Sequence, residues 1–323
     1  MDAFGLTVLA AHDAGGARVL SAYAARRLAG RRLAFVLAGP AVDIFAERLG
    51  PLRVARPDVV DSLDPAMDRV LTATSWLADL ERDAIRRARR RGVHCTAFLD
   101  HWMNFRERFL PPAAWNSIGA DWTAHLPDTV VATDRYAYEL ALALGFPDAR
   151  LRLETNPHFE DIREAFAARP PRDRTGTPRR VLWISEPVSE LDILDPSLRP
   201  GFSEFTAVAD LVQTVAALPD DAGTAVRIRL HPKEHAGKYD VLLAGSGRIA
   251  LSVAPDLLDD LAWADAVVGM ESTALVVALV AGIPVFSYFP ASARRQCSLP
   301  HQEIGRVDTL SEIFLTPITG HPK

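Results

Sequence analysis

The sequence has only two cysteines and no long apolar segment. Cys95 and Cys297 stand far apart with no Cys-x-x-Cys pair, which excludes a disulfide framework and a cysteine zinc site. The longest apolar run, residues 274–285, contains Gly282 and Pro284 and is shorter than the ~20 residues that a membrane span requires. The first residues carry no basic stretch of the kind that marks a secretory signal. We therefore expect a cytoplasmic protein.

An excess of positive charge is also lacking. The formal net charge is −5, so we expect no broad basic surface and no nucleic-acid partner. With 49% hydrophobic and 24% charged residues, the composition is that of a globular protein. A length of 323 residues indicates two domains, at roughly 150 residues per domain.

Short apolar runs alternate with segments of helical period, which is the pattern of parallel α/β layers. In the first half we expect strands at 6–11, 32–38, 68–73, 94–99 and 129–132, with helices at 16–28, 41–49, 75–91 and 134–144. In the second half we expect strands at 180–185, 225–230, 248–252, 265–269 and 284–287, with helices at 202–218, 238–244, 257–264 and 272–281. A last helix at 309–315 is expected to pack across both halves.

A stretch rich in proline and arginine separates the two halves. It contains Pro157, Pro170, Pro171 and Pro178, and it predicts domains over 1–160 and 180–323 joined by a linker over 161–179. The predicted fold class is α/β, with two Rossmann-like domains facing a cleft. Ligands of such sheets bind at the carboxyl ends of the strands, where loops lead into helices.

Several common catalytic motifs are missing. The first strand-to-helix junction is not G-x-G-x-x-G, and no G-x-x-x-x-G-K-[ST], G-x-S-x-G or H-E-x-x-H sequence occurs. A nicotinamide dehydrogenase and a P-loop enzyme are therefore not expected. The nearest carboxylate pair, Asp259-Asp260, falls within a predicted helix and is interpreted as a solvated face. We expect no metal and no other cofactor.

The first candidate site is the junction after the first strand, which consists of His12-Asp13-Ala14-Gly15-Gly16. Small residues there let backbone N–H groups approach a ligand at the start of the next helix. His12 or Asp13 could act as a general base. The plainer alternative is that Asp13 caps the helix and His12 fills space.

The second candidate site follows the strand 94–99. It has the sequence Asp100-His101-Trp102-Met103-Asn104-Phe105-Arg106-Glu107-Arg108. Asp100 is a third candidate base, and His101, Asn104 and Arg106 suit recognition of a polar or anionic substrate. The aromatic residues Trp102 and Phe105 either stack on a sugar or anchor the loop.

Two further motifs lie in the second half, each after a strand. His231-Pro232-Lys233 offers donors for a phosphate, and lysine occurs elsewhere only at Lys238 and Lys323. The other motif is Gly269-Met270-Glu271-Ser272-Thr273, where hydroxyls and N–H groups at a helix start form an anion pocket or simply a cap. Two such sites in one sheet favour a nucleotide-binding cradle.

A basic run ends the predicted helix 75–91. It reads Arg86-Arg87-Ala88-Arg89-Arg90-Arg91, at a helix end where the dipole favours positive charge. We interpret it as a solvated face. The alternative is peripheral contact with an anionic membrane that carries a lipid-linked acceptor.

These motifs together resemble those of GT-B glycosyltransferases of the bacterial surface-polysaccharide type. His231-Pro232 is similar to the His-Pro motif of bacterial sialyltransferases and CDP-glycerol polymerases. Further similar segments are Ala264 to Gly269, Glu271 to Leu275, Ala281 to Val285, and Leu126-Pro127-Asp128 through Thr155-Asn156-Pro157-His158-Phe159. One departure concerns the acidic motif of sialyltransferases, for which only Asp220-Asp221-Ala222-Gly223 is present, before a strand.

The resemblance implies a metal-independent glycosyltransferase that moves a sugar from a nucleotide-activated donor to a glycan or lipid-linked acceptor. Residues 1–160 would form the acceptor side, with Gly15 and Gly16 in its loop. Residues 180–323 would bind the donor through His231, Lys233, Glu271, Ser272 and Thr273. The alternatives are a sugar-nucleotide epimerase or hydrolase on the same fold, or a non-catalytic protein that binds nucleotide sugars.

Overall fold

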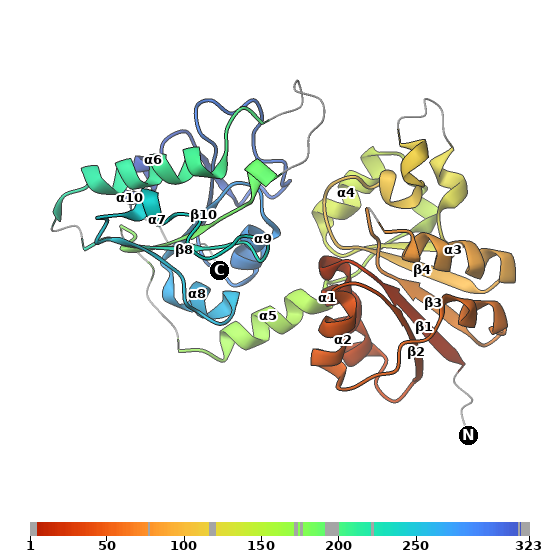
Figure 1. Ribbon diagram of the computed structural model, residues 1–323. Helices are drawn as coiled ribbons and strands as arrows, with labels where there is room; N and C mark the ends of the chain where they lie inside the picture. The colour runs from red at the N-terminus through yellow and green to blue at the C-terminus, as the bar shows by residue number, and fades with distance from the viewer. Residues whose placement is uncertain are drawn as a thin grey trace. The chain divides into compact units, whose positions relative to one another are not determined.

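A computed structural model of the chain describes residues 5–76, 78–115, 121–170, 174, 177–190, 200–220, 223–315 and 317. The chain divides into two compact units, Met1–Asp161 and Ile162–Lys323. Each unit contains a six-stranded sheet whose strand pairs are all parallel, with helices on both faces (Figure 1). The predicted α/β class with two Rossmann-like sheets is confirmed, and the cleft between them stays a prediction.

The first unit has strand order β2-β1-β3-β4-β5-β6. Its strands are β1 (Leu6–Ala11), β2 (Arg32–Leu37), β3 (Arg69–Thr72), β4 (His94–Leu99), β5 (Thr129–Ala132) and β6 (Leu151–Leu153). Its helices are α1 (Ala14–Arg27), α2 (Ala41–Leu49), α3 (Leu80–Arg91), α4 (Arg135–Ala143) and the start of α5 (Pro157–Ala167). Short 3-10 helices cover Pro57–Ser62, Glu107–Phe109, Pro112–Ala114, Trp122–His125 and Asp148–Arg150.

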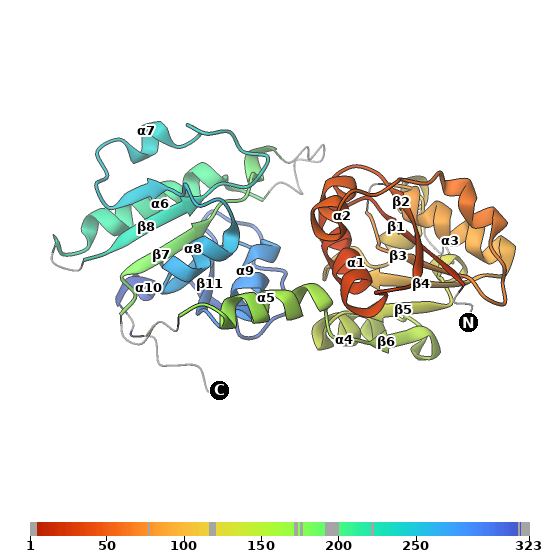
Figure 2. The same ribbon diagram turned by 90° about the horizontal axis from the view of Figure 1, so that it is seen from below.

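The core of this unit follows from the alternation of side chains along the strands. Leu9, Leu71 and Phe98 point to one face, where they pack against α1 and α2 through residues such as Leu20 and Phe45. Helix α3 covers the opposite face against β1, β3 and β4 (Figure 2). Both faces are buried, which is why these parallel strands are nearly continuous apolar runs.

The strand order of the first unit reverses beside β1. From β1 the chain passes to β2 on one side, and it later returns to β3 on the other side of β1. Ligands of open α/β sheets bind at such a reversal, outside the carboxyl ends of the strands. His12-Asp13 and Thr74-Ser75 follow the ends of β1 and β3, so both pairs stand at this point.

The second unit has strand order β12-β11-β10-β7-β8-β9. Its strands are β7 (Arg180–Ile184), β8 (Ala225–Arg229), β9 (Ile249–Leu251), β10 (Ala266–Gly269), β11 (Val285–Tyr288) and β12 (Gly305–Val307). Its helices are α6 (Glu204–Ala217), α7 (Asp240–Leu243), α8 (Leu257–Trp263), α9 (Thr273–Val280) and α10 (Ser311–Leu315), with a 3-10 helix at Val188–Glu190.

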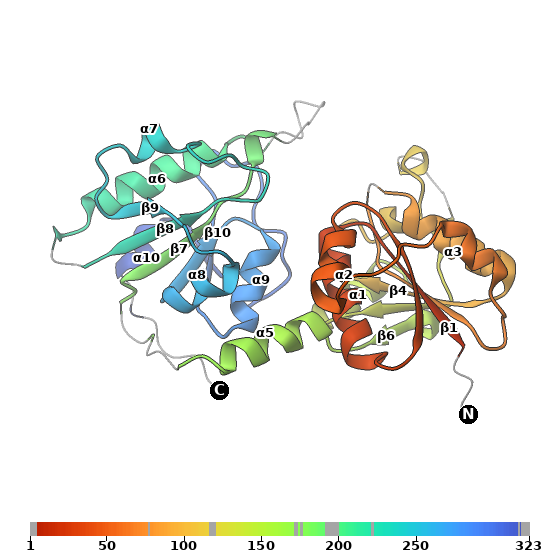
Figure 3. The ribbon, with the colours of Figure 1, turned by 60° about the horizontal axis from the view of Figure 1, so that its bottom comes forward.

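Helices α6 and α10 cover one face of this sheet, while α8 and α9 lie on the other (Figure 3). The order reverses between β7 and β10, because the chain runs from β7 out to β9 and then returns to β10. The residues after β7 and β10 are Ser185-Glu186 and Met270-Glu271-Ser272, which places them at the second reversal point.

Some of the predicted boundaries are wrong. The helix expected at 75–91 begins only at Leu80, because Ser75 instead bonds Asp13 and the N–H of Ala78. The last helix packs Ile313 and Phe314 into the core of the second unit. Strands β6 and β12 are short and escaped prediction.

Helix α5 also escaped prediction, although its first turns lie in the proline-rich stretch. Asn156 bonds the N–H groups of His158 and Phe159 through its side-chain oxygen. Arg26 and Arg27 of α1 pair with Glu160 at 2.9 Å, and Arg48 of α2 pairs with Asp161. The residues 161–167 that were assigned to a linker are therefore helical.

The carboxylate pair Asp259-Asp260 was only half correctly interpreted. Asp259 is partly exposed and pairs with Arg169 at 2.8 Å. Asp260 is wrong as a solvated residue, since its side chain has 0% exposure and pairs with Arg229 at 2.7 Å. Ser252 also donates to it at 2.6 Å. Helix α8 turns one carboxylate outward and the next onto the sheet, because successive helical residues are about 100° apart.

The arginines at the end of α3 are mostly exposed, and two of the five, Arg86 and Arg87, have acidic partners. Arg86 pairs with Asp79 at 2.9 Å, and Arg87 pairs with Asp83 at 2.7 Å. Arg91 donates to the carbonyl of Leu63. These partners reduce the positive charge that the run presents, and its contact with a membrane stays a prediction. Among the described residues, no helix has the length and apolar character to cross a membrane.

Candidate functional site

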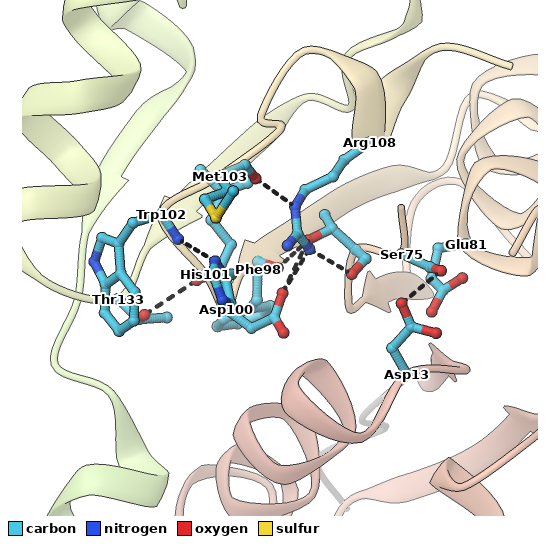
Figure 4. A network of polar contacts seen from close by, with 12 residues as sticks. Asp13, Ser75, Glu81, Phe98, Asp100, His101, Trp102, Met103, Arg108 and Thr133 are labelled. Carbon is cyan, nitrogen blue, oxygen red and sulfur yellow. Dashed lines mark hydrogen bonds and ion pairs between the residues drawn. The ribbon is translucent and has the colours of Figure 1, made fainter. Parts of the chain in front are cut away.

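His12, Asp13 and Ser75 form a hydrogen-bonded chain at the reversal point of the first sheet. His12 Nδ1 lies 2.7 Å from Asp13 Oδ1. Ser75 Oγ donates to Asp13 Oδ2 at 2.7 Å, and Figure 4 shows these two side chains. Asp13 is the N-cap residue of α1 but makes no capping bond with its side chain. The capping interpretation of Asp13 is therefore wrong. A carboxylate only accepts, so Nδ1 carries the proton and the neutral ring keeps its lone pair on Nε2.

Glu81 of α3 bonds the backbone of His12 and so holds this hydrogen-bonded chain in place. Its Oε1 accepts the backbone N–H of His12 at 2.7 Å, and its side chain is buried in the first turn of α3. Oε2 is buried and has no hydrogen-bond partner among the described residues. Burial raises the pKa of Glu81 to about 7, the His12 N–H opposes the rise, and the Asp13 charge adds to it.

Asp100 stands beside the same loop but is tied into an ion pair. Its Oδ1 lies 2.8 Å from Nη1 of Arg108, and the two side chains are only 7% and 9% exposed. Arg108 also donates to the carbonyls of Thr74 and Met103 at 2.9 and 3.2 Å (Figure 4). Oδ1 of Asp100 is thus already engaged by Arg108 and by the hydroxyl of Thr74. Of the three candidate bases, the geometry favours His12.

Close backbone approach explains the glycines of the first junction. A Cβ on Gly15 would lie 2.3 Å from Asp100 Oδ2, and one on Gly16 would lie 2.5 Å from the Cβ of Ala73. A third glycine, Gly39 after β2, has φ of +55° and leaves room beside His12 Nε2. The glycines therefore let the ends of β2, β3 and β4 approach the junction after β1 closely.

The other residues of the Asp100 loop mostly build the loop itself. Asn104 adopts the left-handed conformation with φ of 55°. The Nδ1 atom of His101 accepts the N–H of Trp102 at 2.9 Å. Arg106 donates to the carbonyl of Leu144 and lies over the ring of Trp122. The structure thus gives Arg106 a role in holding the end of α4.

The aromatic residues expected to meet a sugar are buried. Trp102 is 4% exposed with its Nε1 bonded to Asp134, and Phe105 is 1% exposed. Of the two alternatives, loop anchoring is therefore correct. Trp76 is 41% exposed, and it stacks on Trp115 with ring centroids 5.3 Å apart. An exposed indole thus adjoins Ser75 in sequence.

Glu186, which follows β7, bonds the residues that follow β10 at the reversal point of the second sheet. Its Oε1 accepts the backbone N–H groups of Met270, Glu271 and Ser272 at 3.0, 2.8 and 2.9 Å. Burial raises the pKa of Glu186 to about 7, the N–H bonds oppose the rise, and the Glu271 charge adds to it. The N–H groups of this turn thus bind a carboxylate of the same chain, and a pocket for an anionic ligand at this place stays a prediction.

The remaining polar groups of this turn point to a cap and an ion pair. Ser272 accepts the N–H of Ala274 at 3.2 Å as the N-cap of α9, whose first residue is Thr273. Glu271 pairs with Arg295 at 2.7 Å. The capping interpretation of Ser272 is therefore confirmed.

His231 is held by its own loop in one tautomer. Its Nδ1 accepts the N–H of Lys233 at 3.1 Å, and its own N–H donates to Glu234 Oε2 at 2.7 Å. The neutral ring therefore has its proton on Nε2, where it can be donated to a ligand. Burial lowers the pKa of His231, so the ring is neutral at ordinary pH.

The two lysines of this region differ sharply. Lys233 is exposed. The Lys238 side chain is 4% exposed and contacts Glu190, Glu204 and Glu234, the last at 2.9 Å. Glu234 in turn accepts from Ser185 at 3.0 Å. Lys238 thus fixes Glu234, and Glu234 fixes the loop of His231.

Within the described ranges, no group of three His, Cys, Asp or Glu side chains could hold a metal ion. Ser75, Glu81 and Glu186 are not predicted as site residues from the sequence. The only available signal was their position after a strand or at a helix start, which many polar residues share. Their partners lie 62 to 86 positions away in the chain.

Comparison with known proteins gives structural matches only. No family model and no curated protein matches the chain. UDP-GlcNAc 2-epimerase from Methanocaldococcus jannaschii has a TM-score of 0.57 at 11% identity, over 87% of this chain and 83% of that one. The chain has a GT-B-like fold.

Two further solved structures are similar to the same extent. Anabaena Alr3699/HepE in complex with UDP has a TM-score of 0.57 at 11% identity, over 97% of this chain and 88% of that one. UDP-GlcNAc 2-epimerase from Neisseria meningitidis bound to UDP-GlcNAc has a TM-score of 0.57 at 11% identity, covering 90% and 84%. The expected GT-B fold is confirmed, whereas the finer likeness to sialyltransferases and CDP-glycerol polymerases receives no support from these matches.

Proposed function

We propose that this chain is an enzyme that acts on a nucleotide sugar and breaks the bond between the anomeric carbon and the diphosphate. The observation that carries the proposal is the His12–Asp13 pair, with Nδ1 held at 2.7 Å and Nε2 left as the basic atom. A histidine oriented by a carboxylate is a standard arrangement for a general base. Its position at a sheet reversal point is where ligands of this architecture bind.

The nucleotide end is assigned to the second unit. His231 offers Nε2–H as a neutral donor, and the turn at Met270–Ser272 has three backbone N–H groups, which donate to Glu186 when no ligand is bound. Such donors stabilise a departing phosphate without a metal ion. Lys233 is exposed and can reach a phosphate, while Thr273 lies at the start of α9.

Epimerisation of a UDP-sugar is the first reaction to test, because UDP-GlcNAc 2-epimerases and a UDP complex are among the structural matches. Inversion of the carbon beside the anomeric centre can begin when a base takes its proton while the diphosphate departs. His12 Nε2 would receive that proton. The C–H electron pair would form the new C=C bond, and the C–O electrons would leave with UDP.

The experiment begins with binding. Thermal shift and calorimetry with UDP, CDP, GDP, dTDP and CMP should give UDP the highest affinity. UDP-GlcNAc is then incubated with the enzyme alone and followed by proton NMR. New anomeric signals without an acceptor support epimerisation. Absence of UDP binding in a folded protein would contradict the proposal.

Metal-independent glycosyl transfer is the second candidate, and a specific observation favours it. Asp100 is paired with Arg108, so His12 is the favoured base among the three candidates, and direct displacement by an acceptor hydroxyl needs only one base. In this case UDP is released only when a glycan or lipid-linked acceptor is added. Release of UDP and free sugar into water would indicate hydrolysis. Tight binding without any turnover would indicate a non-catalytic binding protein.

A further inference from the structure

Glu186 occupies the place where an anionic ligand would sit in the second unit. Its Oε1 is within 3.0 Å of three consecutive backbone nitrogens, those of Met270, Glu271 and Ser272. These are the donors that the helix start offers to an anion, and each N–H has one proton to give. The bonds of Glu186 also link the residues after β7 to those after β10, and these two strands flank the reversal point of the sheet.

We propose that ionised Glu186 and the diphosphate of the substrate compete for these three N–H groups, so that substrate binding is coupled to uptake of a proton by Glu186. The inference rests on the proposed function, because it assigns the diphosphate to this turn. A diphosphate and an ionised carboxylate in one partly desolvated site repel each other, and the weaker acid takes a proton.

The surrounding charges support this assignment. Glu271 of the same turn adds a second negative charge beside Glu186, and it is itself held by Arg295 from the segment after β11. His231, after β8, is neutral because burial lowers its pKa. Lys238 is already committed to Glu190, Glu204 and Glu234. None of these groups supplies Glu186 with a cation as partner.

A direct consequence is a pH-dependent affinity. With the pKa of Glu186 raised to about 7, the carboxyl is mostly protonated at pH 6 and mostly ionised at pH 8.5. Affinity should therefore fall tenfold for each pH unit above 7, or roughly 30-fold at pH 8.5. Protonated Glu186 no longer competes, and its O–H becomes a donor that can face a phosphate oxygen.

The test measures binding of UDP-GlcNAc and UDP-glucose between pH 6.5 and 8.5. Their phosphates are diesters without the ionisation near pH 6 that phosphate monoesters have, so the ligand contributes no proton change. Calorimetry in two buffers of different ionisation enthalpy counts the protons. Near pH 8.5 the native protein should take up about one proton on binding.

Glu186→Gln and Glu186→Ala separate competition from a merely structural role. If Glu186 competes, both variants bind UDP-GlcNAc roughly tenfold or more tightly than the native protein at pH 8.5, with little pH dependence and no proton uptake. If Glu186 only braces the turn, the variants bind more weakly and melt lower, which overturns the inference. Asp220→Asn is the control, since it removes one fully exposed charge of the second unit that contacts none of these residues.

The failure of the inference differs from the failure of the proposed function. Native protein that binds the UDP-sugar with a flat pH dependence, matched by Glu186→Gln, overturns the competition alone. Native and variant proteins that are folded but bind no UDP-sugar at any pH overturn the proposed function and this inference with it. If the affinity of His231→Asn for the UDP-sugar keeps the same pH dependence, His231 is not the titrating group and the dependence is assigned to Glu186.

Discussion

Ser75 donates its hydroxyl proton to Asp13 Oδ2 at 2.7 Å, while Oδ1 of the same carboxylate holds His12 Nδ1 at 2.7 Å. The bond joins the carboxyl ends of β1 and β3, which are neighbours in the sheet but 62 positions apart for these two residues. Asp13 is thus fixed on both oxygens. It orients the imidazole, and Nε2 of His12 becomes the proposed base.

Removal of this base should slow the chemical step and spare nucleotide binding. His12→Gln is expected to lower single-turnover rates ~10²–10⁴-fold, the usual contribution of a general base, with UDP affinity nearly unchanged. Asp13→Asn should also slow the reaction and shift the pH profile of the rate, because the imidazole loses its carboxylate partner. The exposed His125→Gln serves as control. If His12→Gln reacts at the native rate, the base lies elsewhere.

His231 should contribute to binding of the nucleotide. His231→Ala is expected to weaken UDP binding by ~1.5–3 kcal/mol, the range for a hydrogen bond to a charged group. His235→Ala is the matched control, because His235 is exposed on the same loop and its Nδ1 faces the carbonyl of Ala236. Calorimetry with UDP gives the comparison. Equal affinities of the two variants would remove His231 from the nucleotide site.

Turnover should not require a divalent cation. The proposed phosphate donors are an imidazole N–H, backbone N–H groups and a lysine, which stabilise negative charge without a metal. Activity measured after dialysis against EDTA should equal that measured with added magnesium or manganese. Loss of activity on chelation, followed by recovery with either ion, would contradict the proposed phosphate site.

Glu81 should make stability depend on pH. Burial raises the pKa of Glu81 to about 7 from an ordinary value near 4.5. Between pH 4.5 and 7, Glu81 is therefore protonated in the folded protein but ionised in the unfolded chain. Stability is therefore expected to fall as the pH rises from about 4.5 to 7, by up to about 3 kcal/mol. Glu81→Gln should remove this slope in urea unfolding experiments. An unchanged slope in the variant would assign the effect to other groups.

The neighbours Asp259 and Asp260 should differ strongly when replaced. Asp260→Ala leaves Arg229 and Ser252 without their buried partner, and it is expected to destabilise the second unit by about 3 kcal/mol. Asp259→Ala breaks a partly exposed pair with Arg169 and should cost less than about 1 kcal/mol. Thermal and urea unfolding measure the stability of the two variants. A similar decrease in the free energy of unfolding for both would show that the buried contacts of Asp260 add no stability beyond those of Asp259.

The local pattern of the chain determined most of its elements. The apolar runs that became β1, β4 and β10 are buried on both faces, so a nearly continuous hydrophobic run was enough to predict them. Gly15 and Gly16 were expected to let backbone N–H groups approach a ligand, which stays a prediction, whereas their close contacts with Asp100 and Ala73 appear only in the folded chain. Short elements such as β6 were missed, because three residues carry too little periodicity for prediction.

The order of the strands was decided only by the tertiary structure. The sequence indicated that His12-Asp13 and Met270-Glu271-Ser272 follow strands, but not that β3 lies beside β1 or that β7 lies beside β10. Those pairings bring Ser75 to Asp13 and Glu186 to the start of α9, across 62 and up to 86 positions of chain. A side chain that serves a distant partner looks locally like any polar residue in a loop. Its role therefore depends on which strand ends the folded sheets place together.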